Sequence, residues 1–485
     1  MSDGADGGAD GGAEGFVRAL LDGGSLTPLA EVPGGGGPGV LAGFGTVEGR
    51  DVCVLAHTGP GAGGPLGAAA VAAEVRVRAL AARTGRPLVT VHDATGPGTA
   101  QGFGELVRSA VALSGVVPQV AVVLGAADAE RALLLPLADV VVATAAARSA
   151  LADPGAVAAA GGSPAPAGTA ALHAGSTGRF ARVEPDAVAA AGFVRELLAH
   201  LPSNNLATAP RPAPPGGWDG GWDGGLDGEL DEDPDDELDA LLPADPAAPH
   251  DVRAVLEHLA DDGFLELHAQ HAASVVTAFA RIDGRSTGVV ATQPAVLAGA
   301  LDAAACAKAA RFVRFCDAFG LPVLTAVDTA GFVPAAEGAA GDLTAAAAQL
   351  LYAYAEASVP LLTVLTGRAH GPAATALGSR HVGADVVLAW PRARLGAREA
   401  VAQVAAAHGE ELAVAAASGR DAEAQWLRRL AEQEERAAPG AAVAAGDVDA
   451  VLAPGATRAH LARALRLLQR KAVPPPARRH GNVPL

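Results

Sequence analysis

The sequence is poor in aromatic residues and in cysteine. Phe, Trp and Tyr together make up 4% of its 485 residues, so a large core must be built from Ala, Val and Leu on closely approaching backbones. The three cysteines, Cys53, Cys306 and Cys316, show no metal-ligand spacing and are too few for a disulfide framework. We therefore expect a protein of a reducing, cytoplasmic compartment.

Long apolar runs and an excess of basic residues are also absent. The longest apolar stretches, such as Val140 to Ala147, are far shorter than the ~20 residues that a bilayer requires. The segment from Met1 to Gly15 lacks the basic start and the apolar run of a secretory signal. Acidic residues outnumber basic ones by 53 to 35, and the net charge of −18 argues against nucleic-acid binding. These absences predict a soluble protein with neither a membrane nor a nucleic acid as partner.

Composition divides the chain into four segments. Residues 1–15 predict a disordered acidic tail, and residues 16–201 form an apolar region with Gly-rich interruptions. Residues 202–249 are rich in Pro, Gly and Asp, carry a WDGG repeat and contain the acidic run Asp231 to Asp239, all typical of a solvated linker. Residues 250–485 are apolar again. We expect two globular domains joined by this linker.

The two apolar regions resemble each other. GTVEGRDVCVLA around Gly49 parallels ARIDGRSTGVVA around Gly284, and Asp93 stands at the same separation from Asp328 as Gly49 does from Gly284. Farther along, the separation grows slightly at the matching segments PQVAVVLG and PLLTVLTG, and it grows again at the two Ala-Asp-Val-Val segments. An ordered series of matches with small increases in spacing is typical of a duplicated domain.

Within each half, β-branched apolar runs alternate with Ala-rich helical stretches. In the first half, strands are predicted at residues 51–56, 87–92, 118–124 and 139–143, and helices at 67–82 and 99–113. In the second half, the clearest helix is predicted at residues 302–319. This alternation predicts right-handed βαβ units around a buried sheet, an α/β fold. Gly-rich turns at residues 94–98 and 329–331 follow strands, at the edge where open α/β sheets bind ligands.

Individual polar residues give weak signals. His268 and His271 have no suitably spaced carboxylate, so a surface or partly buried role is favoured over metal binding. Asp93 and Asp328 end equivalent strands, where capping of the following turn is favoured over a general-base role. No Ser-His-Asp set, zinc motif, P-loop or GxGxxG stands in its required context.

Two strand–turn–helix segments remain, at Gly125 to Glu130 and at Gly367 to Pro372. Backbone amides that begin the following helix suit a developing negative charge. A site made of backbone amides needs no diagnostic side chain, so composition alone does not separate it from a packing turn. From the residues themselves, both interpretations stay open.

Longer motifs in the second half resemble those of one known family. They are RIDGRSTGVVATQP (Arg281 to Pro294), KAARFVRFCDAFGLPVLTAVDTAGFVP (Lys308 to Pro334), LLYAYAEASVPLLTVLTGRAHG (Leu350 to Gly371), GSRHVGADVVLAWP (Gly378 to Pro391) and RHGNVPL (Arg479 to Leu485). Similar stretches occur in the carboxyltransferase β subunit of biotin-dependent acyl-CoA carboxylases, the propionyl-CoA type above all. GFGTVEGRDVCVLA, GGPLG and RTGRPLVTVHD in the first half also fit, so the resemblance covers nearly the whole chain from Phe16 onward.

This resemblance implies two duplicated crotonase-like (ClpP/crotonase) carboxyltransferase domains. Residues 16–201 are expected to hold the acyl-CoA, and residues 250–485 of a partner subunit the carboxybiotin. The family forms hexamers and works with an α subunit that carries biotin carboxylase and biotin. The biotin left by CO2 release takes the α-proton of the acyl-CoA, whose enolate attacks CO2, so the protein supplies two oxyanion holes and excludes water. No metal is expected in this subunit.

The resemblance places catalytic residues at the two turns, where this sequence departs from the family. Gly371, Pro372 and Ala373 are expected at the biotin carbonyl, and Pro372 replaces a glycine whose amide is expected to donate. Proline has no N–H. Ala129 and Glu130 are expected at the thioester in place of paired glycines. Their amides survive, but Cβ atoms limit approach and Glu130 adds a carboxylate.

The acyl-CoA loop and the biotin pocket complete the expected sites. The acyl-CoA-binding residues implied by the resemblance are Ala94, Thr95, Gly96, Gly98, Gln101 and Gly102, and the loop lacks the family's arginine. Gly331 and Phe332 are expected to flank the biotin pocket, and Thr375 lies where the family tunes acyl length.

The expected function follows from the resemblance and from the departures together. We expect carboxyl transfer from carboxybiotin to a short acyl-CoA. Because the loss of one oxyanion donor typically costs about 10²–10³ in rate, two alternatives from other classes stay open. One is a catalytically impaired scaffold or regulatory paralogue, and the other is a repurposed acyl-CoA decarboxylase or hydrolase. A scaffold tolerates Pro372 and Glu130, whereas a carboxylase must compensate for both.

Overall fold

A computed structural model divides the chain into two compact units. Unit 1 comprises residues 1–210 with 267–271, and unit 2 comprises residues 211–266 with 272–485. The residues that the structure describes are 12–32, 39–58, 67–93, 102–152, 154–162, 168–212, 236–243, 245, 248–334, 342–418, 421–474, 477 and 480–484.

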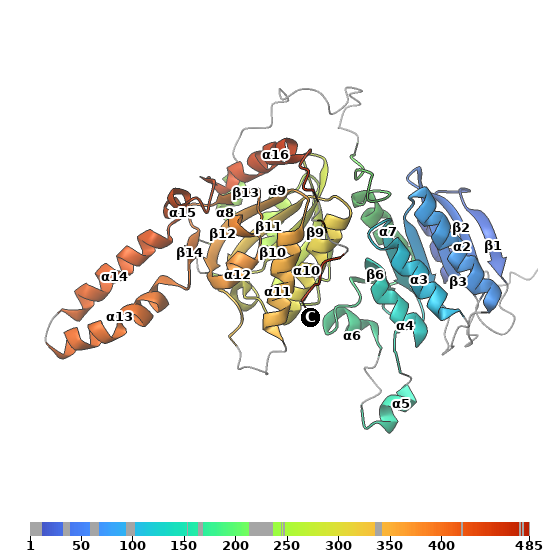
Figure 1. The fold of residues 1–485 in the computed structure, drawn as a ribbon, viewed down its shortest axis with the longest axis horizontal. Helices are drawn as coiled ribbons and strands as arrows, with labels where there is room; N and C mark the ends of the chain where they lie inside the picture. Colours follow the sequence, from blue (N-terminus) through green and yellow to red (C-terminus); the bar gives the residue numbers. More distant parts are fainter. Residues whose placement is uncertain are drawn as a thin grey trace, which may run out of the picture. The chain divides into compact units, whose positions relative to one another are not determined.

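A seven-stranded sheet with its strands in chain order forms the centre of unit 1 (Figure 1). Its strands are β1 (Thr27–Val32), β2 (Gly39–Val47), β3 (Arg50–Thr58), β4 (Leu88–His92), β5 (Gln119–Val123), β6 (Val140–Thr144) and β7 (Arg182–Glu184). β1, β2 and β3 pair antiparallel, and β3 to β7 pair parallel. All residues of β4, β5 and β6 are buried, as expected for strands covered on both faces.

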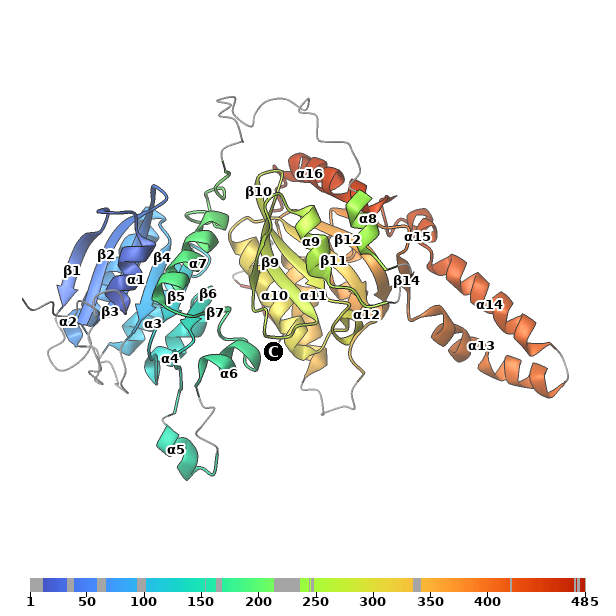
Figure 2. The same ribbon diagram turned by 180° about the vertical axis from the view of Figure 1, so that it is seen from behind.

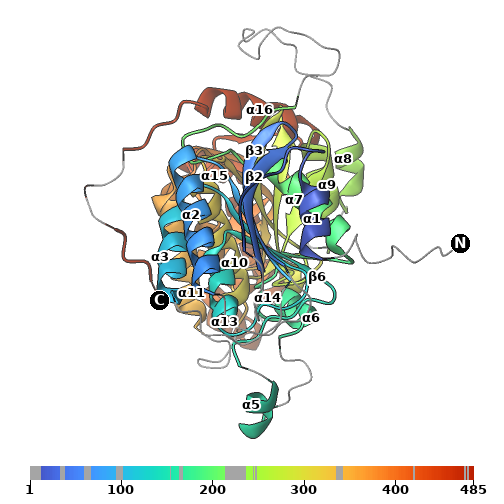
Figure 3. The same ribbon diagram turned by 90° about the vertical axis from the view of Figure 1, so that its right-hand side faces the viewer.

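Helices cover both faces of this sheet, with α2 and α3 on one face and α1 and α7 on the other (Figure 3). The helices of unit 1 are α1 (Ala13–Leu20), α2 (Ala68–Thr84), α3 (Phe103–Leu113), α4 (Glu130–Leu134), the 3₁₀ helix η1 (Leu135–Leu137), α5 (Pro154–Ala159), α6 (Ala170–Gly175) and α7 (Ala187–His200). The strands and helices predicted for the first half are therefore confirmed, except that residues 99–101 of one predicted helix lie outside the described residues.

Unit 2 repeats this design around an eight-stranded sheet, ordered β15-β13-β12-β11-β10-β9-β8, with β14 paired to β12. Its strands are β8 (Phe264–Leu267), β9 (Val275–Ile282), β10 (Arg285–Thr292), β11 (Val323–Thr329), β12 (Leu361–His370), β13 (Val386–Ala389), β14 (Arg394–Gly396) and β15 (Ala450–Val451). The helix α10 confirms the helix predicted at residues 302–319.

The helices of unit 2 also cover two faces, with α10 and α11 on one and α9 and α16 on the other (Figure 2). They are α8 (Asp236–Leu241), α9 (Val252–Leu259), η2 (Leu297–Gly299), α10 (Ala303–Ala318), α11 (Leu343–Glu356), α12 (Gly371–Ala376), η3 (Arg380–Val382), α13 (Ala400–Ala417), α14 (Ala422–Ala437), α15 (Pro439–Ala445), η4 (Pro454–Ala456) and α16 (Thr457–Leu468). No helix in the described ranges is long and apolar enough to cross a membrane.

Strand register confirms the duplication residue by residue. The parallel pairs β3–β4, β4–β5 and β5–β6 of unit 1 recur in unit 2 as β10–β11, β11–β12 and β12–β13, with the stepwise separations that the sequence matches show. The equivalent residue pairs are Cys53–Leu88 and Gly288–Val323, Leu88–Gln119 and Val323–Leu361, and Val120–Val140 and Leu362–Val386. Equivalent positions in the two halves can therefore be compared directly.

The expected disordered tail and the expected solvated linker both contain helical residues. α1 begins at Ala13, within the expected tail of residues 1–15, because Phe16 is fully buried against unit 1. α8 lies within the expected linker, and Leu238 packs into the core of unit 2 beside α9. The acidic run thus contains an apolar residue, Leu238, that packs α8 against unit 2. The WDGG repeat lies outside the described residues.

Candidate functional site

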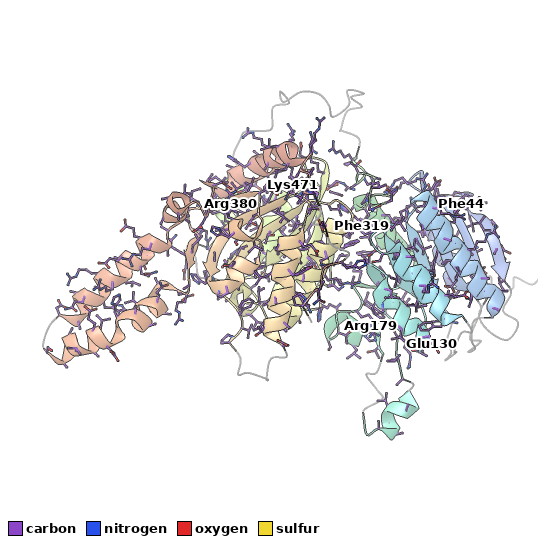
Figure 4. The ribbon with its side chains drawn as sticks, in the orientation of Figure 1. Phe44, Glu130, Arg179, Phe319, Arg380 and Lys471 are labelled. Carbon is purple, nitrogen blue, oxygen red and sulfur yellow. The ribbon has the colours of Figure 1, made fainter. Side chains whose placement is uncertain are left out.

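The segment of residues 125–130, here called the N-turn, joins β5 to α4 (Figure 4 labels Glu130). Its backbone adopts a conformation suited to glycine, because Ala129 has φ 53° and ψ −122°. An L residue is strained there, whereas glycine is not. The N-turn therefore keeps the backbone expected of a glycine at position 129 while carrying an alanine.

Hydrogen bonds fasten the N-turn to a neighbouring segment of unit 1. The N–H of Ala129 donates to the carbonyl of Ala150 over 2.8 Å, and the N–H of Ala150 donates to Asp128 Oδ1 over 2.8 Å. The Ala129 amide is therefore engaged within unit 1, and its role at the thioester stays a prediction. Within the described part of the chain, the amide of Glu130 donates to no other group.

The segment of residues 367–372, here called the C-turn, joins β12 to α12 in unit 2. Gly371 has φ 65°, and a Cβ there would lie 3.2 Å from the carbonyl of Ala397. The first amides of a helix have no acceptor within the helix. In α12 these amides belong to Gly371 and Ala373, since Pro372 between them has none. Ala373 is buried and Pro372 is exposed.

The structure brings the expected biotin-pocket residue Gly331 beside the C-turn. Gly331 follows β11, and a Cβ on it would lie 3.9 Å from the carbonyl of His370. Its own carbonyl accepts the N–H of Leu301 over 3.0 Å, which holds the segment in place. Phe332 next to it is half-buried, and Thr375 is exposed on α12.

Most of the expected acyl-CoA loop lies outside the described residues, namely Ala94, Thr95, Gly96, Gly98 and Gln101. Gly102 is described and forms the N-cap of α3, where a Cβ would come within 2.8 Å of the side chain of Val71. The acyl-CoA-binding role of these residues therefore stays a prediction.

The two aspartates that end equivalent strands have different partners. Asp93 Oδ2 accepts the N–H of Ala13 over 3.0 Å and so caps α1, while the turn that it was expected to cap lies outside the described residues. Asp328 is buried, and its Oδ1 accepts both the backbone N–H of Arg368, over 3.0 Å, and its Nε, over 2.8 Å. Both carboxylates therefore hold other parts of the chain in place, in keeping with a structural role.

Two histidines lie near the buried Asp328–Arg368 pair. Burial lowers the pKa of His250, against the opposing charge of Asp328, and burial also lowers the pKa of His370, against that of Glu399. Both imidazoles are therefore favoured in the neutral form close to the C-turn. Neither residue was identified from the sequence, because no spacing connects them to the motif.

Unit 1 holds a larger set of buried ionisable side chains that the sequence analysis missed. We call it the buried charge network; its members are His57, Glu74, Arg78, His92 and Arg131, each at most 7% exposed. His57 Nε2 lies 2.7 Å from Glu74 Oε1, and Arg78 Nη2 lies 3.5 Å from Glu74 Oε2. The ring centroids of His57 and His92 are 4.8 Å apart. Comparison of the two duplicated halves would have revealed this set.

The histidine pair considered as a metal site has an ordinary role. His271 Nδ1 lies 2.9 Å from the carbonyl of Gly175, and His268 has a positive φ of 57° in the loop before it. Among the residues that the structure describes, no group of three or more His, Cys, Asp or Glu side chains is arranged to hold a metal ion.

Comparison with known proteins shows the family to which this chain belongs. The carboxyl transferase domain family matches residues 30–483. The biotin-dependent acetyl-/propionyl-coenzyme A carboxylase beta5 subunit of Mycobacterium tuberculosis is 38% identical over 460 residues, which cover 93% of this chain and 83% of that protein. The propionyl-CoA carboxylase beta chain of Saccharopolyspora erythraea is 40% identical over 461 residues, covering 93% and 84%.

A solved structure is similar over almost the entire chain. Transcarboxylase 12S, whose structure is described as a hexamer assembly with methylmalonyl-coenzyme A bound, has a TM-score of 0.89 and 31% identity. The similarity covers 98% of this chain and 92% of that one.

Proposed function

Since the chain belongs to the carboxyl transferase family, we propose that it is the carboxyltransferase (β) subunit of a biotin-dependent acyl-CoA carboxylase. In this role it moves a carboxyl group from carboxybiotin to the α carbon of a short acyl-CoA. The observation that carries the proposal is the pair of equivalent strand–turn–helix segments, one in each register-matched half. Two such segments suit a reaction in which two carbonyl groups develop negative charge.

The chain's own residues divide between the two carbonyls. Glu130 at the N-turn retains an amide for the acyl thioester, while the amide of Ala129 is bonded to Ala150. Gly371 in the C-turn and Ala373 directly after it retain first-turn amides for the ureido oxygen of biotin, which a partner protein would carry. Biotin would supply the carboxyl group in its carboxylated form, and the residues present fit it in part, because Pro372 contributes no donor.

One lost donor at each turn favours slow carboxyl transfer. A single oxyanion donor typically contributes about 10²–10³ in rate. The second candidate function is therefore a scaffold or regulatory paralogue that keeps the fold and has lost the chemistry. The two observations that favour it are Pro372 within α12 and the engaged amide of Ala129.

Assembly and partners are part of the proposal. We infer a homo-hexamer that binds acyl-CoA and an α subunit with biotin carboxylase and a biotin carrier, in the cytoplasm. The support is the similarity to transcarboxylase 12S and to the named β subunits.

Carboxyl transfer can be tested without the α subunit, because the reaction is reversible. Purified protein is incubated with methylmalonyl-CoA, with and without free biotin, and the acyl-CoA products are separated by chromatography. The proposed function predicts biotin-dependent conversion to propionyl-CoA. Loss of methylmalonyl-CoA without biotin would indicate a decarboxylase or hydrolase instead. Binding of methylmalonyl-CoA without any conversion would indicate the scaffold.

A further inference from the structure

The C-turn follows an irregularity in the sheet of unit 2. β11 and β12 pair regularly up to Val327 and Leu365, but the next pair is Thr329 with Ala369. Between these two pairs β12 has two residues more than β11, and the longer segment bulges opposite Asp328. A bulge changes the direction of its strand and is frequent beside active sites. The direction in which β12 enters the C-turn is therefore set at Asp328.

The carboxylate of Asp328 binds the bulged segment twice. Its Oδ1 accepts the backbone N–H of Arg368 over 3.0 Å and the side-chain Nε–H of the same residue over 2.8 Å. A Cβ on Gly367 would overlap this carboxylate, so the chain passes in direct contact with it. Asp328 is 1% exposed and Arg368 is 8% exposed. The first two residues of the C-turn are thus fixed against one buried side chain.

Asp328 is itself held by neighbouring segments of unit 2. Its N–H donates to Thr292 Oγ1 over 2.7 Å, and that hydroxyl donates to the carbonyl of Asp328 over 3.0 Å. In the next residue, Thr329 Oγ1 accepts the N–H of Gly331 over 3.1 Å. Thr292 is the last residue of β10, and Gly331 lies beside the C-turn. Asp328 therefore connects the C-turn to the end of β10 and to the segment of Gly331.

Unit 1 lacks this arrangement at the equivalent positions. By the matched register, Asp93 corresponds to Asp328 and Ala126 corresponds to Arg368. An alanine has no side-chain donor that could replace the Nε–H of the arginine. The pairing of β4 with β5 is also regular to its end. The Asp328–Arg368 pair is thus confined to the half that is expected to receive carboxybiotin.

Stability gives little reason to keep such a pair. Desolvation of a buried ion pair offsets most of the attraction between its charges, so apolar residues of similar shape are often equally stable. Arg368 Nη2 and Asp328 Oδ2 are also buried without a hydrogen-bond partner in the described part of the chain. The pair therefore points to a role in geometry. Geometry matters at this turn, because Pro372 has no N–H and the amides of Gly371 and Ala373 on either side of it must act.

We propose that Asp328 is the positioning residue of the biotin half-site: through the backbone N–H and the Nε–H of Arg368, it holds the C-turn so that the amides of Gly371 and Ala373 face the ureido oxygen of biotin. The proposal rests on the proposed function, because it assumes that the C-turn receives biotin. Misplacement by ~1 Å can cost about 10²-fold in rate. Asp328 acts through the chain and does not touch the substrate.

Asp328→Ala removes both hydrogen bonds and tests the proposal. Carboxyl transfer from methylmalonyl-CoA to free biotin is measured with the full-length protein, and calorimetry gives the stoichiometry and affinity of methylmalonyl-CoA binding. We expect kcat/KM for biotin to fall about tenfold or more, with a raised KM for biotin, while methylmalonyl-CoA binding stays unchanged. A mere loss of folded protein would lower the binding stoichiometry and leave the KM for biotin unchanged.

Two further variants serve as matched controls. Asp328→Asn keeps an oxygen that can accept the backbone N–H of Arg368, so its kcat/KM for biotin should lie closer to that of the wild type than that of Asp328→Ala does. Asp385 makes a similar pair of contacts at the opposite end of β12, because its Oδ2 accepts the N–H of Leu361 over 2.8 Å and a hydrogen bond from Lys471 Nζ over 2.8 Å (Figure 4 labels Lys471). Asp385→Ala should leave kcat/KM for biotin unchanged.

Hydrogen exchange gives a readout that needs no turnover. In Asp328→Ala, the amides of residues 368–377, at the end of β12 and in α12, should exchange about tenfold faster or more than in the wild type. The amides of residues 119–134, which include the N-turn of unit 1, should keep their wild-type rates. Faster exchange in both regions would indicate a general loss of stability and would overturn the positioning role.

The outcomes separate the two proposals. An unchanged kcat/KM for biotin in Asp328→Ala, or an equal loss in Asp385→Ala, would overturn the role of Asp328 and leave the proposed function standing. If the wild type shows no biotin-dependent conversion, the proposed function fails; faster exchange confined to residues 368–377 would then still support Asp328 as the residue that holds the C-turn, and unchanged exchange would refute it. If Asp328→Ala does not fold, Arg368→Met decides, because it removes the Nε–H bond alone: the role is refuted if kcat and KM for biotin match those of the wild type.

Discussion

The backbone at Ala129 offers a direct test of how far this chain departs from its family. Ala129 has φ 53° and ψ −122°, a combination that an L residue adopts only under strain of about 1–3 kcal/mol. Replacing it with glycine removes that strain but costs about 0.5–1 kcal/mol in conformational entropy of the unfolded chain. Ala129→Gly should therefore stabilise unit 1 by about 1 kcal/mol, from the difference of these two contributions.

A stabilisation of this size is measurable. For a unit of about 200 residues, 1 kcal/mol corresponds to a rise in Tm of about 2–4 °C. Thermal unfolding followed by circular dichroism would show it, and urea titration should give a higher midpoint at an unchanged slope.

Ala298 supplies the matched control for this measurement. It also has a positive φ, 53°, but its ψ of 33° places it in the left-handed helical region, where strain is about 1–2 kcal/mol. Ala298→Gly should therefore stabilise unit 2 by about 0.5–1 kcal/mol, from the same difference of strain and entropy. If Ala129→Gly is neutral or destabilising while Ala298→Gly behaves as expected, the N-turn relaxes around the Cβ, and the inference of strain at position 129 is refuted.

Three other outcomes are expected. Pro372→Gly should raise kcat for carboxyl transfer from methylmalonyl-CoA to free biotin more than it changes KM, because the restored amide acts on developing charge; an unchanged kcat would mean that another amide already donates. Burial lowers the pKa of Lys308, whose Nζ donates to the carbonyl of Val275, to about 8. The folded protein therefore loses this proton above pH 8, whereas the unfolded chain keeps it up to a pKa of about 10.4. Folding stability measured by urea titration should rise between pH 8 and about 10.4, and Lys308→Met should remove that rise. An identical pH profile of stability in both proteins would refute this prediction. Light scattering at micromolar concentration should show a hexamer, and a stable monomer would contradict the proposed assembly.

Much of the fold could be predicted from the sequence because its determinants are local and periodic. The Val-rich runs that became β4, β5 and β6 are continuous in the chain, and the helices between them follow from Ala-rich stretches. The stepwise separations between matching segments reappear unchanged in the strand register, since a duplicated chain preserves its pairing order. Segment ends were predicted less well, because Phe16 and Leu238 are ordered by burial against distant residues.

The candidate site was also predicted only in part from the sequence. The sequence by itself determined where the two turns lie and that Pro372 has no N–H to donate. Only the tertiary structure decided that the amide of Ala129 is bonded to Ala150, that Asp328 pairs with Arg368, and that Glu74 lies beside His57. The partners in each of these pairs lie far apart in the chain and belong to different segments of the fold. Which donors and charges are left for a ligand depends on such pairings, and no local pattern of residue types specifies them.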